Sequence, residues 1–349
     1  MGSGRTTQAN ARNTEATFVT ISMKMARSKA LFRRTVPGPF QRAAVAILLL
    51  IPACRTDDDV ALSSSAPEPT VIAVTSYPLL VMAQELAGEH AEVQLVTEDD
   101  VASPDWKPTN SGIHQMQGAT KILISGGDFE PWLQRVTIPK SRLVDTADGY
   151  YDQFIRISDA LLHQHGPEGA HSHPGVVWTT WLDPQLAQSQ LDRVREVLVQ
   201  MLPHAASDIH RVADKRSEQL EQLEQRLEQL KQRYSDVRIT GDAPVYQYLT
   251  RRLGWKLDYA HWPTHGSVPD EQKAELQQLI SEDRPQLLLI QSDHMDDLGD
   301  VGVPVCSVDL CIHAAGDADF WQRLEENLTR LEAAAELMSP AAEFGRPVP

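Results

Sequence analysis

The segment from Ala205 to Tyr234 contains neither glycine nor proline, and no other feature of the sequence constrains the fold as strongly. Its leucines recur three and four residues apart and therefore share one face of a helix, whereas Glu, Gln, Lys and Arg cover the other faces. These leucines are Leu220, Leu223, Leu227 and Leu230. Their seam is shorter than a coiled-coil dimer requires. We therefore expect one long helix packed within a monomer.

Short apolar runs alternate with helical patterns on both sides of this helix. The runs before it lie at residues 70–75, 93–96 and 121–125, and those after it lie at 237–240, 256–259, 286–290 and 303–308. Strands that alternate with helices form parallel sheets covered on both faces. The predicted fold class is α/β, with two parallel-sheet α/β lobes joined by one long rigid helix and a cleft between the lobes.

The N-terminal segment has the composition of an export signal. A basic stretch ending at Arg42 precedes the apolar run 43–51, which is too short to span a bilayer. The residues at 51–54, Ile-Pro-Ala-Cys, resemble a lipobox, in which the cysteine becomes lipidated. We expect an exported lipoprotein of the cell envelope, attached to the membrane through Cys54, in the periplasm or on the membrane surface.

The chain divides into five predicted regions. They are a signal peptide with lipobox at 1–54, a flexible tether at 55–69, an N-terminal α/β lobe at 70–204, a linker helix at 205–234 and a C-terminal α/β lobe at 235–349. The tether is rich in Asp, Ser and Pro and has no apolar period. The N-terminal lobe includes a histidine-rich loop at 163–173.

Charge is distributed unevenly along the chain. Residues 1–54 hold eight basic side chains and one acidic one, so that of the chain's 32 basic and 48 acidic residues, 24 and 47 lie downstream. An acidic body of this kind repels nucleic acid and attracts cations. The sequence also lacks the Gly-x-Ser-x-Gly, phosphate-loop and His-Glu-x-x-His motifs of common enzyme classes. We expect neither a nucleic-acid partner nor an enzyme.

Two cysteines, Cys306 and Cys311, remain downstream of the lipobox. In an oxidising compartment they form a disulfide around a short loop, or they are two small buried residues. The sequence leaves both interpretations open.

The motif Trp-Leu-Asp-Pro at 181–184 opens a predicted helix, with Asp183 as its N-cap. Further motifs are the Tyr-Pro turn at 77–78, Ser-Pro-Asp-Trp at 103–106, Gly-Asp-Ala at 241–243 and Val-Asp at 308–309. Together they resemble the solute-binding lipoproteins of zinc and manganese ABC importers, the cluster A-I periplasmic metal-binding proteins. The resemblance covers residues 70–337. It implies an ABC permease in the membrane as partner and a divalent metal ion, zinc or manganese, as the transported ligand.

The resemblance also implies four metal ligands, and three of them are missing here. The first histidine is deleted between Pro104 and Asp105, Thr179 stands at the second position and Gly241 at the third. Only Asp309 remains. Since zinc takes about four donors in a tetrahedral array, we expect the ancestral site to be lost.

Other side chains near strand ends offer a replacement site, because strand-end loops of α/β sheets line the crevices where ligands bind. The candidate ligands are Asp309, Asp105, His261, His265 and His313, with His294 as a further histidine that follows a strand. A carboxylate at position 105 would favour manganese. The alternatives are that these histidines are solvated loop residues, or that the cleft takes a chelated metal or another small solute.

The histidine-rich loop carries two His-x-His pairs, which is a metal-binding composition. The four residues are His163, His165, His171 and His173. The resemblance implies an accessory metal loop that captures or senses zinc, and the alternative is a polar surface loop. Two functions therefore remain open: the solute-binding component of a metal-ion ABC importer, or an accessory metal-buffering lipoprotein that acts through this loop and feeds no permease.

Overall fold

The computed structural model describes residues 70–97, 104, 106–157, 162–164, 170–172, 175–264, 266–313 and 319–338. The predicted signal peptide, Cys54 and the tether lie outside the described residues, as do Asp105, His165, His173 and His265. Within the described part of the chain, no helix is long and apolar enough to cross a membrane.

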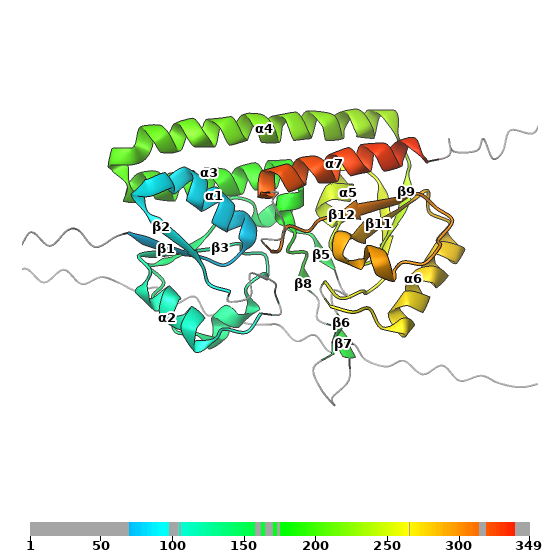
Figure 1. Ribbon diagram of the computed structural model, residues 1–349, viewed down its shortest axis with the longest axis horizontal. Helices are drawn as coiled ribbons and strands as arrows, with labels where there is room; N and C mark the ends of the chain where they lie inside the picture. The colour runs from blue at the N-terminus through cyan, green and yellow to red at the C-terminus, as the bar shows by residue number, and fades with distance from the viewer. Residues whose placement is uncertain are drawn as a thin grey trace, which may run out of the picture. The chain divides into compact units, whose positions relative to one another are not determined.

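The N-terminal lobe is built on a parallel sheet with the strand order β2-β1-β3-β4. Its strands are β1 (Val71–Val74), β2 (Glu92–Leu95), β3 (Lys121–Ile124) and β4 (Leu143–Asp145). Alternate residues of β1 point to opposite faces. Ile72 and Val74 pack in one core with α1 (Tyr77–Ala87), whereas Ala73 packs in another with Met116 of α2 (Asn110–Gly118). The two helices therefore cover opposite faces of the sheet (Figure 1).

The C-terminal lobe repeats this plan with a parallel sheet in the order β10-β9-β11-β12. Its strands are β9 (Arg238–Gly241), β10 (Lys256–Tyr259), β11 (Leu287–Gln291) and β12 (Val305–Val308). Leu288 and Ile290 pack with Leu276 of α6 (Asp270–Asp283), and Leu287 and Leu289 pack on the other face, in the core that includes α5 (Gln247–Leu253). The predicted α/β class with two parallel sheets is confirmed.

Three further helices lie along the top of the view in Figure 1. They are α3 (Pro184–Met201), α4 (Ala206–Arg233) and α7 (Phe320–Glu336). The helix α4 is the predicted long helix and runs over both lobes (Figure 1). All four of its predicted leucines are buried in one core with residues of both sheets. Arg216 of α4 donates to Glu85 of α1, which also accepts from the indole of Trp321 of α7 at 3.0 Å. This cluster fixes α1, α4 and α7 to one another.

The histidine-rich segment was predicted as a loop, and the structure corrects this in part. It contains two short strands, β6 (Leu162–Gln164) and β7 (Ala170–Ser172), which pair antiparallel with His163 opposite His171. Each of these strands has three residues, which are too few to show the alternation of apolar and polar side chains that predicts a strand. A second short antiparallel pair joins β5 (Arg156–Ile157) to β8 (Gly175–Val176).

Cys306 and Cys311 are both free and buried. The structure therefore supports the interpretation as two small buried residues. Burial raises the pKa of Cys311 well above its usual value, and the neighbouring Asp309 raises it further. Such a thiol is held in its unreactive, protonated form.

Candidate metal site

A small pocket of about 10 Å³ lies where β11 and β12 end. Carboxyl ends of neighbouring parallel strands bring their loops together, and ligands commonly bind there. The polar side chains that line the pocket include Thr264, Gln291, Asp293, Asp309 and His313. Its volume suits about one water-sized occupant. A larger cavity of about 30 Å³ lies beneath α4 and α7, but Asn327 is its one polar lining residue, so it offers no set of metal donors.

Asp309 and His313, two of the predicted ligands, therefore line the same pocket. The Nε2 atom of His313 lies 3.8 Å from a carboxylate oxygen of Asp293. Asp309 accepts from the backbone N–H of Cys311 at 2.7 Å, and its other oxygen lies 3.4 Å from Nη1 of Arg323. The one ligand that survives from the resembled site thus already has a cation beside it.

His261, a third predicted ligand, does not line this pocket. Its Nδ1 lies 2.8 Å from Oε1 of Glu275 on α6, and its backbone N–H donates to the same carboxylate. The structure therefore places His261 against α6 and not among the residues that line the pocket with Asp309.

His294 is buried, with only 1% of its side chain exposed. Its Nδ1 lies 3.5 Å from Oδ2 of Asp242, and its ring packs edge-on against Trp262. Asp242 also accepts from the backbone N–H of Gln291 and from the hydroxyl of Tyr246. Asp242 therefore ties the ends of β9 and β11 together, a structural role that the sequence analysis did not identify.

The space beside Gly241, the predicted third ligand position, is filled by a neighbouring side chain. A Cβ atom at this position would lie 2.8 Å from Cδ2 of Tyr246. The Tyr246 ring is fully buried and its hydroxyl donates to Asp242 at 2.6 Å, so it cannot easily move away. Burial raises the pKa of Tyr246 well above its usual value, and the Asp242 charge adds to this. A histidine has no room here.

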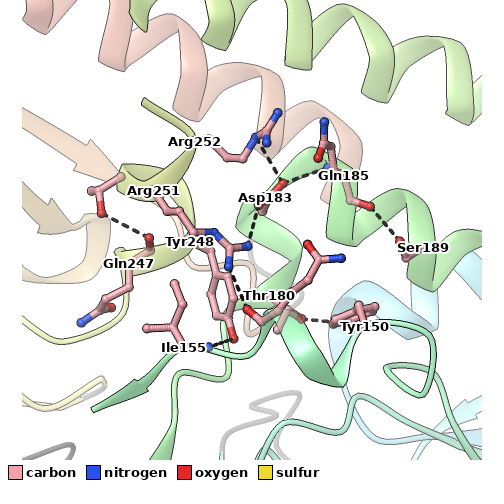
Figure 2. Close-up of polar contacts among 12 residues, drawn as sticks. Tyr150, Ile155, Thr180, Asp183, Gln185, Ser189, Gln247, Tyr248, Arg251 and Arg252 are labelled. Carbon is pink, nitrogen blue, oxygen red and sulfur yellow. Dashed lines mark hydrogen bonds and ion pairs between the residues drawn. The ribbon is translucent and has the colours of Figure 1, made fainter. Parts of the chain in front are cut away.

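Asp183 N-caps α3 as predicted, and its carboxylate accepts from the backbone N–H of Gln185 at 3.0 Å. Figure 2 shows the same carboxylate facing two arginines of α5, with Nη2 of Arg251 at 3.2 Å and Nε of Arg252 at 3.7 Å. Burial raises the pKa of Asp183, and the two guanidinium groups oppose that rise. The Trp-Leu-Asp-Pro motif therefore joins the N-terminal lobe to α5 of the other lobe.

Further contacts to α5 reinforce this junction. The backbone N–H of Ile155 donates to the hydroxyl of Tyr248 at 3.1 Å, and Arg251 donates to the carbonyl of Gln153 at 2.8 Å. Thr179, the predicted second ligand position, is fully buried and donates to the carbonyl of Val245. This hydrogen bond is a further contact between the two lobes.

The strand ends of the N-terminal lobe contain a buried carboxyl group, Glu130. It accepts from the hydroxyl of Thr75 at 2.5 Å and from the backbone N–H groups of Ser125 at 2.7 Å and Gly126 at 3.0 Å. Burial raises the pKa of Glu130 to about 7, although these hydrogen bonds oppose the rise. Glu130 therefore fixes the loop after β3.

Among the described residues, no group of three or more His, Cys, Asp or Glu side chains is arranged to hold a metal ion. Two of the predicted ligands, Asp105 and His265, lie outside that part of the chain. The described donors therefore amount to Asp309, His313 and Asp293 around one pocket. His163 and His171 are backbone partners in the antiparallel pair β6–β7, which is called the hairpin below and is separate from this pocket.

Comparisons with known proteins agree with this architecture. The model of the family described as zinc-uptake complex component A, periplasmic (ZnuA), matches residues 72–334. The iron-binding protein YfeA of Yersinia pestis is 25% identical over 233 residues, which cover 65% of this chain and 71% of YfeA. The zinc-binding lipoprotein AdcA of Streptococcus pneumoniae is 23% identical over 198 residues, which cover 53% of this chain and 37% of AdcA.

Among solved structures, that of the solute-binding protein FpvC of Pseudomonas aeruginosa in complex with Mn²⁺ has a TM-score of 0.62 at 16% identity. The match covers 78% of this chain and 99% of FpvC. Similarity at this level of identity indicates a common fold. Together with the family match over most of the sequence, it identifies the chain as a member of the ZnuA family of periplasmic zinc-uptake components.

Proposed function

We propose that this protein is the solute-binding component of a metal-ion ABC importer. It captures zinc or manganese, as a divalent ion or as a metal complex, and presents it to a permease in the membrane. The observation that carries this proposal is the family match over residues 72–334 on a fold whose two parallel sheets are joined by one long helix. Binding proteins of this kind need no covalent chemistry.

The candidate binding region is the pocket at the ends of β11 and β12. Asp309 and His313 line it, and Asp105 and His265 are the further candidates in segments that the structure does not describe. Because these donors are few, a metal complex that brings its own donors suits the pocket better than a bare zinc ion, which takes about four protein or water ligands.

The hairpin histidines form the second candidate region. In the antiparallel pair β6–β7 the Cα atoms of His163 and His171 are register partners, and His165 and His173 follow closely in sequence. Neutral imidazoles bind zinc, and the affinity falls as the pH drops through about 6.5, where histidine becomes protonated. These histidines would collect metal, and lipidation at Cys54 would keep the protein at the membrane.

Metal analysis tests this proposal. The protein is purified without added metal, its zinc and manganese contents are measured, and both ions are then titrated calorimetrically. The same measurements use a variant in which the four hairpin histidines are replaced by alanine. A control carries His114→Ala and His210→Ala, two exposed histidines on helices.

We expect the hairpin variant to lose part of its metal binding and the control to lose none. If the hairpin variant loses all tight binding, the pocket has no role and the protein acts as a metal buffer. If the unmodified protein binds neither metal, and a strain lacking the gene accumulates zinc and manganese normally, the importer proposal is wrong.

A further inference from the structure

Arg323 is a buried cation at the edge of the candidate metal pocket. It lies on the first turn of α7, and its side chain is only 3% exposed. Nη1 donates to the carbonyl of His313 at 2.7 Å and lies 3.4 Å from Oδ2 of Asp309. On its other side the guanidinium lies 5.3 Å from the centre of the Tyr77 ring of α1, within the range of a cation–π contact. Arg323 on α7 is therefore held by two other segments of the chain, the loop 309–313 after β12 and α1.

Asp309 is held equally firmly. Its backbone N–H donates to the side-chain oxygen of Asn327 at 2.8 Å, and the amide of Asn327 donates back to the Asp309 carbonyl at 2.8 Å. One carboxylate oxygen accepts from the N–H of Cys311, and the other faces Arg323. The carboxylate cannot turn toward a ligand without breaking one of these contacts.

A divalent ion bound to Asp309 would share one carboxylate with a fixed positive charge. Arg323 is buried and the Asp309 side chain is 25% exposed, so water screens the repulsion between the two cations only in part. An arginine cannot relieve it by losing its proton. Moving the guanidinium away from Asp309 would break an ion pair that involves a buried charge, which is also unfavourable. The positive charge of Arg323 therefore already compensates the negative charge with which Asp309 would attract a metal ion.

We propose that Arg323 is a specificity-determining residue that excludes bare divalent cations from Asp309. The inference rests on the proposed function for the role of this pocket, and it narrows the class of solute that the pocket accepts. A solute that binds next to Asp309 cannot depend on the negative charge of this carboxylate, because Arg323 compensates it. A metal complex that carries its own anionic donors meets this condition.

The test removes the positive charge and asks whether a metal site appears. All variants carry the four alanine substitutions in the hairpin, so that hairpin binding does not interfere. Arg323→Met keeps a long, flexible side chain without the charge. Mn²⁺ and Zn²⁺ alone are titrated calorimetrically, and we expect about tenfold tighter binding or more than in the hairpin variant itself. Adding Asp309→Asn to Arg323→Met is expected to abolish the gain.

Arg330→Met is the matched control. Arg330 lies further along α7 and donates to the carbonyl of Ser307 and the side chain of Asn327. Its removal changes the net charge by the same amount next to the same segment. We expect no gain in metal affinity, because among the described residues Arg330 pairs with Glu326, whereas Asp309 pairs with Arg323. Arg323→Lys keeps the charge and is expected to keep the exclusion.

Circular dichroism and thermal unfolding show whether each variant is folded. If Arg323→Met does not fold, Asp309→Asn alone tests the proposal, because it should leave Mn²⁺ and Zn²⁺ affinity unchanged while Arg323 is present. The proposal is overturned if Arg323→Met binds no more tightly than its parent, if Arg330→Met gains equally, or if Asp309→Asn alone weakens binding. None of these outcomes decides whether the unmodified protein binds metal, which the hairpin comparison above measures separately.

Discussion

The hydroxyl of Thr179 donates to the backbone carbonyl of Val245 at 2.5 Å, and this hydrogen bond joins the two lobes at the predicted second ligand position. Thr179 is fully buried, so the contact is shielded from water. At a position where the metal ligand is predicted to be missing, the side chain contributes to the junction between the lobes.

Restoring a histidine at this position is therefore expected to damage the fold and not to create a metal site. Thr179→His places a larger ring in a filled space and removes the hydrogen bond, so we expect the free energy of unfolding to fall by about 2–3 kcal/mol. Urea unfolding with and without Zn²⁺ measures this. Thr179→Val, which removes only the hydrogen bond, should cost about 1 kcal/mol. Stabilisation of Thr179→His by Zn²⁺, beyond that of the unmodified protein, would contradict this interpretation.

Gly241→Ala tests whether Tyr246 closes the third ligand position. The new Cβ would lie 2.8 Å from a ring that is buried and hydrogen-bonded, so we expect a loss of about 1–3 kcal/mol in the free energy of unfolding. Gly118→Ala, where no atom lies within 4 Å of the new Cβ, is the control and should be neutral or slightly stabilising. In a double-mutant cycle, Tyr246→Ala should remove most of the penalty at position 241. If the two substitutions are additive, Tyr246 is not the obstacle.

Asp183 supplies both a helix cap and an inter-lobe ion pair, and two substitutions separate these roles. Asp183→Asn keeps a good N-cap but removes the charge facing Arg251 and Arg252. Because both arginines are partly exposed, we expect a loss of only about 2 kcal/mol. Asp183→Ala also removes the cap and should cost about 1 kcal/mol more.

Urea unfolding measures both variants of Asp183. Asp192→Asn, which removes an exposed carboxylate paired with Arg195 within α3, should change stability by less than about 0.5 kcal/mol. Equal stability of Asp183→Asn and the unmodified protein would show that the pair with α5 contributes nothing.

The sequence predicts those parts of the fold that depend on local pattern. Uninterrupted apolar runs predict β1, β3 and β11, because strands buried on both faces carry apolar residues at successive positions. The leucine spacing predicts α4, because only one face of this helix is buried. The strand β4 has three residues and the strands of the hairpin have three each, which is too short for any period to appear. These elements exist because neighbouring strands hold them.

The candidate site was harder to predict, because it depends on contacts between residues far apart in the sequence. The resemblance predicts that Thr179, Gly241 and Asp309 are ligand positions, but it does not predict the contacts that these residues make in the structure. Arg323 lies beside Leu324 on an amphipathic helix, where an arginine is normally solvent-exposed. Its burial follows only when Tyr77 and Asp309 are placed around it.

Glu130 predicts a pH dependence of stability. Burial raises its pKa to about 7 in the folded protein from an ordinary value of 4.5. Between these values the folded state binds more protons than the unfolded state, so the stabilising contribution is fully present below about pH 4.5 and is lost as the pH rises to about 7. A shift of this size corresponds to roughly 3 kcal/mol.

Glu130→Gln removes this titration, so the difference in unfolding free energy between the unmodified protein and the variant should change by about that amount across this range and stay constant above it. Urea unfolding at several pH values gives the difference, and taking a difference cancels the titration of all other groups. Glu92→Gln, at an exposed carboxylate on β2, is the control and should give a nearly flat difference. A difference for Glu130→Gln that is equally flat would mean that the Thr75 hydroxyl and the two backbone N–H groups stabilise the ionised carboxylate enough to offset its burial.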